Sequence, residues 1–166
     1  MQADWDRAIE FVLKMEGGYT LDPNDPGGET NFGISKKAYP SVDIKNLSVD
    51  EAKGIYRRDY WTACECDQLA SPFAIATFDC AVNQGVGKAC RLLQIALGVT
   101  VDGTIGDKTV AASFKADPRT AKKLLAERLA EYARLMVANP NLLVFATNWA
   151  FRVVSLAELI LVQPLG

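Results

Sequence analysis

Histidine is absent from the 166 residues of this chain. Its absence excludes histidine-based catalytic triads and removes the side chain that most often binds transition metals or titrates near neutral pH. The chain also lacks an excess of positive charge, because it has 18 Lys/Arg and 20 Asp/Glu, for a net charge of −2. Domains that bind nucleic acid usually carry a basic excess, so we expect no nucleic-acid partner.

Two kinds of apolar segment are also missing. Residues 1–6 are acidic and lack the basic start and apolar core of a signal peptide, so we expect synthesis in the cytoplasm. The most apolar stretch, residues 142–162, is interrupted by Asn148, Arg152 and Glu158. We therefore expect a buried helix there, not a membrane span, and not an integral membrane protein.

Cysteine is sparse. The four cysteines are Cys64, Cys66, Cys80 and Cys90. In a chain made in a reducing compartment we expect them to stay as free thiols. Their spacing matches no familiar zinc site, so no metal or cofactor is implied. A chain of this length can bury roughly 70% of its unfolded surface without such aids.

The charge that is present is divided unevenly along the chain. Residues 1–83 contain 8 Lys/Arg and 14 Asp/Glu, whereas residues 84–166 contain 10 and 6. The acidic half could hold carboxylate chemistry while the basic half meets an anionic polymer. Equally, the two halves could fold together through complementary faces.

Apolar residues recur at helical spacing through most of the chain. Helix boundaries come from the glycine pair at 17–18, a Ser-x-x-Glu capping box at 48–51 and Ser-Pro at 71–72. Expected helices cover residues 4–16, 49–62, 71–84, 88–97, 107 onward, 118–138 and 142–161. The helix at 71–84 is apolar enough to be the central buried one. The fold class is therefore all-α, with a small β-hairpin near residues 19–34 that pairs 19–21 with 32–34.

Glu16 is the first candidate for chemistry. It lies at the C-terminal end of an amphipathic helix, where unpaired carbonyls carry partial negative charge. Docking of that helix would also remove part of the carboxyl from water, and both effects disfavour ionisation. A carboxylic acid that keeps its proton can protonate a glycosidic oxygen. The alternative is an ordinary exposed glutamate.

A second polar group follows across a turn rich in glycine and proline. Asp25 and Thr30 come nine and fourteen residues after Glu16, and Asp22 competes with Asp25. A helix end facing a hairpin could place such groups on opposite walls of a cleft, where one of them orients a water molecule. Both aspartates could instead serve as turn formers, a role that aspartate fills well beside proline and glycine.

Two motifs add a family resemblance. Residues 16–19 read Glu-Gly-Gly-Tyr, and residues 25–34 read Asp-Pro-Gly-Gly-Glu-Thr-Asn-Phe-Gly-Ile. Together they resemble the N-terminal signature of glycoside hydrolase family 108, which contains N-acetylmuramidases, phage endolysins and relatives known as secretion activators. The resemblance implies that Glu16 is catalytic. The order Glu16, Asp25, Thr30 is also similar to the triad of phage-type lysozymes.

Three further segments are similar to parts of this family. Residues 78–85 resemble its Asp-x-x-Val-Asn-x-Gly segment, in which Asp79 and Asn83 share a helix face; they could line the cleft or tie buried helix ends. Residues 101–109 resemble a segment of small peptidoglycan-binding modules, where Asp107 could cap a helix. Residues 148–152 resemble a Gly-Trp-x-x-Arg element, with asparagine in place of glycine, and we expect Arg152 to pair with a buried carboxylate.

The resemblance implies a lysozyme-like fold with a catalytic lobe at 1–87 and a helical lobe at 88–166, packed as one unit. It implies hydrolysis of the β-1,4 bond between N-acetylmuramic acid and N-acetylglucosamine in peptidoglycan. Glu16 would donate the proton, and Asp25 or Thr30 would assist. The substrate groove would include Tyr19, Asp79 and Asn83.

Two alternatives stay open at this stage. A lytic transglycosylase uses one acid glutamate in the same way but attacks with the 6-hydroxyl of muramic acid. A secretion activator could instead bind the cell wall without catalysis. In each case the site of action is the cell wall or periplasm, and release through a holin or export pore is expected.

Overall fold

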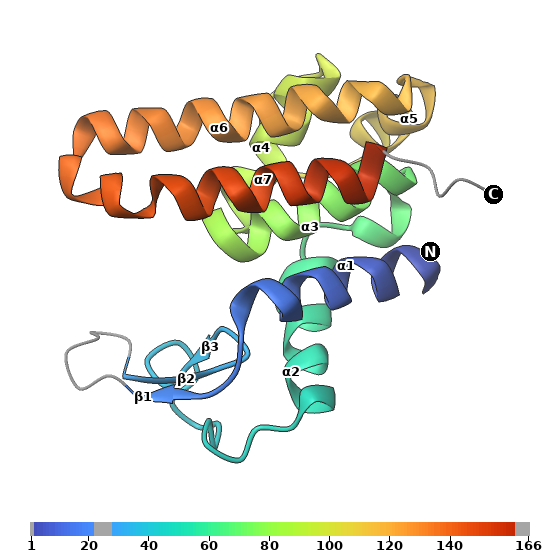
Figure 1. The fold of residues 1–166 in the computed structure, drawn as a ribbon. Helices are drawn as coiled ribbons and strands as arrows, with labels where there is room; N and C mark the ends of the chain where they lie inside the picture. The colour runs from blue at the N-terminus through green and yellow to red at the C-terminus, as the bar shows by residue number, and fades with distance from the viewer. Residues whose placement is uncertain (1, 22–27, 162–166) are drawn as a thin grey trace.

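The computed structural model describes residues 2–21 and 28–161 (Figure 1). Within these residues the α-helices are Gln2–Glu16 (α1), Val49–Tyr56 (α2), Ser71–Gln84 (α3), Val86–Leu97 (α4), Asp107–Lys115 (α5), Ala121–Ala138 (α6) and Ala146–Leu161 (α7). Shorter helical segments are the π-helix Arg57–Thr62 (η1) and the 3₁₀ turns Cys66–Gln68 (η2), Pro118–Thr120 (η3) and Pro140–Phe145 (η4). The strands are Thr20–Leu21 (β1), Glu29–Asn31 (β2) and Ile34–Ser35 (β3). The predicted mainly helical fold with a small sheet is confirmed.

The small sheet differs from the predicted hairpin. It has three antiparallel strands in the order β1-β2-β3, and Thr20 pairs with Thr30. The expected pairing of residues 19–21 with 32–34 is wrong, because the partner strand is β2. Phe32 and Gly33 form a turn with φ angles of 50° and 75°, which reverses the chain into β3. A left-handed φ at phenylalanine is uncommon, so the sequence pattern did not reveal this turn.

Most helix ends follow their local signals. Gly17 adopts φ 76° directly after α1, and Gly98 adopts φ 69° after α4. The capping box at the start of α2 forms as predicted: the Ser48 hydroxyl accepts from the Glu51 amide, and the Glu51 carboxylate accepts from the Ser48 amide. The predicted helix from 49 to 62 continues, however, as a π-helix from Arg57.

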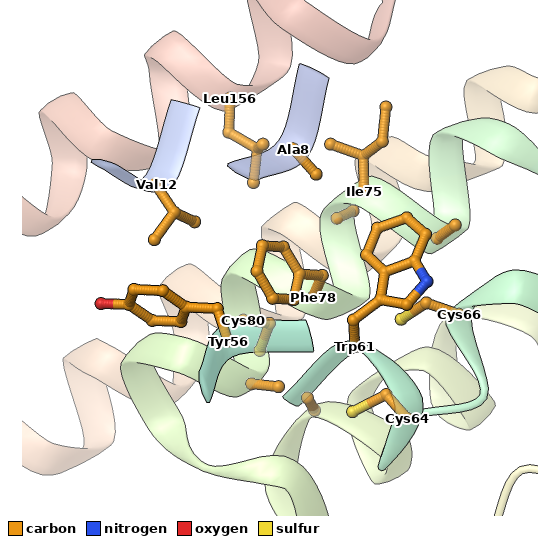
Figure 2. Close-up of a cluster of buried hydrophobic side chains, with 14 of the residues drawn as sticks. Ala8, Val12, Tyr56, Trp61, Cys64, Cys66, Ile75, Phe78, Cys80 and Leu156 are labelled. Atoms are coloured by element: carbon orange, nitrogen blue, oxygen red, sulfur yellow. The ribbon is translucent and has the colours of Figure 1, made fainter. Parts of the chain in front are cut away.

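Helix α3 is the centre of the molecule, as predicted from its apolar composition. Residues 73–81 are all buried, and α3 packs against α1, α4, α6 and α7. The rings of Trp5, Trp61 and Phe78 meet edge to face at centroid distances of 5.4–5.5 Å. Figure 2 shows Phe78 among side chains from α1, α2, η1 and α7, such as Ala8 and Leu156. One hydrophobic core therefore joins the N-terminal and C-terminal halves of the chain.

The four cysteines lie in this interior as free thiols. Cys64 and Cys90 approach each other to 3.9 Å between sulfur atoms, and Figure 2 shows Cys64 and Cys66 near Trp61. Burial raises the pKa of the Cys80 thiol to about 12. Among the described residues no group of three or more His, Cys, Asp or Glu side chains could hold a metal ion.

The last helix departs from expectation. Helices α6 and α7 run antiparallel and are joined by η4 at one end of the molecule (Figure 1). Among the described residues, Pro140–Leu161 is long and apolar enough to cross a membrane, with mean hydropathy 1.4. Only 17% of its most apolar window is buried, whereas a helix inside the core would be mostly buried. The prediction of a buried helix is therefore wrong. Only one side of α7 meets the core, through Arg152, Val153 and Leu156.

Candidate active site

Glu16 is the last residue of α1, and its side chain is 23% exposed. The apolar face of α1 buries Trp5, Ala8 and Val12 against the core, so the end of the helix is fixed against the rest of the molecule. Gly17 then turns the chain away toward β1. The carboxyl is therefore partly enclosed and still reaches solvent, as a residue that acts on a large external substrate must.

The turn between β2 and β3 forms one wall of the site. A Cβ atom added to Gly33 would lie 2.8 Å from Cγ and Oε2 of Glu16, and 2.6 Å from the hydroxyl oxygen of Tyr56. The Tyr56 hydroxyl donates to the carbonyl oxygen of Phe32 at 2.7 Å. Burial, and next the charge of Glu16, raise the pKa of Tyr56, so the phenol stays neutral. Backbone and phenol together confine the carboxyl.

Arg152 of α7 forms the opposite contact. Its Nη1 donates to Oε1 of Glu16 at 2.6 Å, and its Nε donates to Oδ1 of Asp79 at 2.9 Å. The predicted pairing of Arg152 with a buried carboxylate is confirmed. A planar guanidinium with several fixed donors can hold two carboxylates at once. Arg152 therefore ties the end of α1 to α3.

The contacts continue into the interior. The second oxygen of Asp79 accepts from Nη1 of Arg128 at 2.5 Å, and Nε of Arg128 donates to the Tyr132 hydroxyl at 3.1 Å. That hydroxyl donates in turn to Oδ1 of Asn83. Burial alone would raise the pKa of Asp79, but the charges of Arg128 and Arg152 hold it below its ordinary value.

We call this set of six residues the ionic network. Its members are Glu16, Asp79, Asn83, Arg128, Tyr132 and Arg152. They come from α1, α3, α6 and α7, so the network links four helices and contains two carboxyl groups and two guanidiniums. Glu16 and Asn83 are its members that reach the surface.

The position of Asp79 decides between its two predicted roles. The residue is 1% exposed, and both oxygens are engaged by arginines. A carboxylate in this position has no face open to a polysaccharide. The structure therefore supports the alternative in which Asp79 ties buried helix ends, and it places the residue one step behind Glu16.

A surface hollow of about 490 Å³ lies beside the network. Its lining residues are Lys14, Met15, Asn83, Asn148, Trp149, Phe151 and Arg152. Trp149 stacks on Tyr132 with a centroid distance of 4.4 Å and an interplanar angle of 16°. Two other hollows are lined by residues within 41–58 and within 98–109, and neither includes a network residue.

The remaining predicted site residues are placed as follows. The Tyr19 side chain is exposed and donates to Oε2 of Glu29 at 3.2 Å. The Thr30 hydroxyl forms a 2.7 Å hydrogen bond with that of Thr20 across β1 and β2. Asp25 and its competitor Asp22 lie outside the described residues. The structure thus brings Asn83 into the ionic network, and it places Thr30 in β2 and Tyr19 directly before β1.

Sequence reasoning missed Gly33, Tyr56, Arg128 and Tyr132. Arg128 and Tyr132 are four residues apart on α6, so they share one face. A buried arginine needs a carboxylate partner, and Asp79 in an apolar helix was the matching signal. Gly33 is part of the motif at 25–34, but the motif did not reveal its closeness to Glu16, and no sequence signal pointed to Tyr56. Both placements arise only when the turn between β2 and β3 packs beside the end of α1.

Within the segment at 101–109, residues 101–106 form a loop and residues 107–109 begin α5. The Gln94 side chain donates to Oδ1 of Asp102 at 2.7 Å and accepts from the Gly103 amide at 2.8 Å. The expected cap by Asp107 is not formed, because Gly106 is the N-cap residue and Asp107 is the first residue of α5. These contacts hold the loop against α4.

Comparisons with known proteins agree with this architecture. The model of the family Glycosyl hydrolase 108 matches residues 9–85, the part of the chain that contains Glu16, the sheet and α3. No curated protein sequence matches this chain. The structure of Brucella abortus SagA is similar over 97% of this chain and 95% of its own, with 32% identity and a TM-score of 0.82. The chain belongs to glycosyl hydrolase family 108.

Proposed function

We propose that the protein hydrolyses peptidoglycan as an N-acetylmuramidase, with Glu16 as the general acid. Family membership supports a glycosidase that acts on a peptidoglycan-related substrate. The observation that supports the residue assignment is the contrast between two carboxylates in one network. Asp79 is enclosed by arginines, whereas Glu16 is 23% exposed at the edge of the sheet.

The proposed reaction breaks the β-1,4 bond between N-acetylmuramic acid and N-acetylglucosamine. Glu16 donates its proton to the glycosidic oxygen as the bond to C1 of muramic acid breaks, so the leaving sugar departs as a neutral alcohol. Water adds its oxygen to C1 and releases a proton to the second group or to solvent. The two products therefore share the atoms of one water molecule: the hydroxyl is on C1 of muramic acid, and the hydrogen is on the new 4-hydroxyl of N-acetylglucosamine. Glu16 regains a proton from solvent before the next cycle.

The contacts of Glu16 supply positioning. Arg152 holds one oxygen at 2.6 Å, while Gly33, whose turn is held by the Tyr56 hydroxyl, lies beside the other oxygen. Asp79 and Arg128 fix Arg152 from behind. A proton donor held in one orientation avoids the rate loss that a displacement of about 1 Å can cause. We therefore assign Arg152 and Asp79 as positioning residues.

The second group and the substrate groove are proposed from placement. Thr30 lies on the sheet that carries the Gly33 turn, so it is a candidate to orient water, and Asp25 is kept as the sequence-based candidate. Asn83 lines the hollow beside Arg152, where an amide can hydrogen-bond the N-acetyl groups of the glycan. The exposed Tyr19, directly before β1, could also contact the glycan.

Product chemistry tests this proposal. Digestion of purified peptidoglycan, followed by mass spectrometry, should yield fragments with reducing N-acetylmuramic acid ends. Fragments with 1,6-anhydro ends would replace the proposal with a lytic transglycosylase. Binding to the wall without release of reducing ends, at any pH from about 4 to 8, would replace it with a non-catalytic wall-binding role.

The substrate also defines where the protein would act. Peptidoglycan lies outside the cytoplasmic membrane, so the proposal includes passage through a holin or export pore. Expression in cells with and without such a pore tests this: lysis should require the pore. Equal lysis without any pore would contradict the proposed route.

A further inference from the structure

Exposed apolar side chains extend from the end of α6 through η4 to the middle of α7. They are Val137 (84% exposed), Leu143 (60%), Val144 (76%), Phe145 (46%), Phe151 (65%) and Val154 (59%). We call this group the apolar tip. Single exposed apolar residues are normal on protein surfaces, but a contiguous group marks a surface that contacts an apolar partner.

Exposed charge is absent from the same region. Residues 135–157 contain one charged residue, Arg152, and that side chain is buried against Glu16 and Asp79. The whole exposed surface of this stretch is therefore uncharged. Interfaces between copies of one chain can be more apolar than ordinary surface, but they keep a polar rim. A long uncharged surface fits the acyl chains of lipid better than a second copy of the chain.

The composition of Pro140–Leu161 leads to the same partner. This segment meets the length and hydropathy of a membrane-crossing helix. The core helix of a soluble protein can have the same length and hydropathy, but such a helix is mostly buried. Here only 17% of the most apolar window is buried. A signal sequence can do so as well, but it lies near the N-terminus. Contact with lipid is the explanation that agrees with both burial and position.

The inner face of α7 limits how the segment can meet a bilayer. Arg152 is held by two carboxylates, and Val153 and Leu156 are 3% and 0% exposed in the core. Crossing the membrane would pull these residues away from their partners. We therefore propose that the folded protein docks on a lipid bilayer by inserting the apolar tip into one leaflet, without spanning it.

This docking depends on apolar burial and needs no anionic lipid. It does not rest on the proposed hydrolysis: the tip contains no network residue, and of its members Phe151 alone also lines the hollow beside Arg152. Since Arg152 lies on the same helix as Phe151 and Val154, docking would hold the part of α7 that contacts Glu16 close to the membrane surface.

Vesicle flotation tests the proposal. The full chain should float with phosphatidylcholine vesicles to the same extent at about 0.1 M and about 1 M salt, because exposed charge plays no part. The double variant Val144→Asp, Phe145→Ser should lose on the order of tenfold or more in partitioning, since each large side chain adds over about 1.4 kcal/mol, the equivalent of tenfold. Both residues are exposed, so the variant should fold, which circular dichroism checks.

Phe114→Ser is the matched control, because Phe114 is 67% exposed on α5, outside the tip. It should float like the parent. Three results would overturn the proposal: no flotation of the parent, equal losses in Phe114→Ser and the tip variant, or a dimer in analytical ultracentrifugation that the tip variant dissociates while vesicles bind neither protein.

Discussion

Replacing Arg152 by methionine is the sharpest perturbation of the ionic network. Methionine has a similar length and no charge, so the change removes the contacts to Glu16 and Asp79 with little loss of volume. Arg152 is 7% exposed, and removing one partner of a buried ion pair costs roughly 3–5 kcal/mol. The lower end is expected, because Asp79 keeps Arg128 at 2.5 Å and Glu16 can turn to solvent.

A loss of about 3 kcal/mol lowers the melting temperature of a chain this size by about 6–12 °C. Thermal unfolding followed by circular dichroism measures this shift. Arg152→Lys keeps the charge without the planar fork, so its melting temperature should lie between those of the parent and Arg152→Met. A second loss should appear in activity: kcat should fall by on the order of 10²-fold in Arg152→Met, with KM changing little, because a positioning contact acts on the reacting group.

A double-mutant cycle separates the pair from its surroundings. Asp79→Asn alone should also destabilise the fold, and the double variant should lose less than the sum of the two single losses, because the same contact is counted in both. Melting temperatures that fall by less than about 2 °C in Arg152→Met, or single losses that add fully, would refute the reasoning.

Three further outcomes follow from local geometry. Gly33→Ala should lower kcat by on the order of 10²-fold, because its Cβ would lie 2.8 Å from the Glu16 side chain. The control is Gly54→Ala, where a Cβ meets no atom within 4 Å. It should keep activity, and its free energy of unfolding in urea should rise by up to about 1 kcal/mol. The folded-state pKa of Asp79 lies below its ordinary 3.8, so ionised Asp79 stabilises the fold above pH 3.8. This stability should be lost as the pH falls through the folded-state pKa. In Asp79→Asn the acid limb of a stability–pH profile should therefore flatten. Ser48→Ala removes the capping hydroxyl of α2 and should cost about 1 kcal/mol in the same urea assay, whereas an unchanged midpoint would contradict the role of the cap.

Local signals explain what the sequence could predict. Glycine after Glu16 and after Leu97, and the capping box at Ser48, set helix ends through backbone geometry that depends on few residues. The apolar composition of residues 71–84 predicted the central helix in the same way. The position of Glu16 at the end of α1 followed directly, and so did the pairing of Arg152 with a buried carboxylate.

Non-local packing explains the rest. The turn at Phe32 and Gly33 depends on contact with Tyr56, which is distant in sequence. The burial of Asp79 depends on arginines that α6 and α7 bring to α3. Exposure of Val144 could not be read from composition, because an apolar helix has the same sequence whether it lies inside the core or on its surface.

Digestion of purified peptidoglycan by the parent, Glu16→Gln and Glu10→Gln tests the central claim most directly. Glu10 lies exposed on the same helix, so its variant controls for charge and folding. We predict that Glu16→Gln loses about 10²–10⁴-fold in the rate of reducing-end release, while Glu10→Gln matches the parent. Release by Glu16→Gln at the parental rate would contradict the assignment of Glu16 as the proton donor.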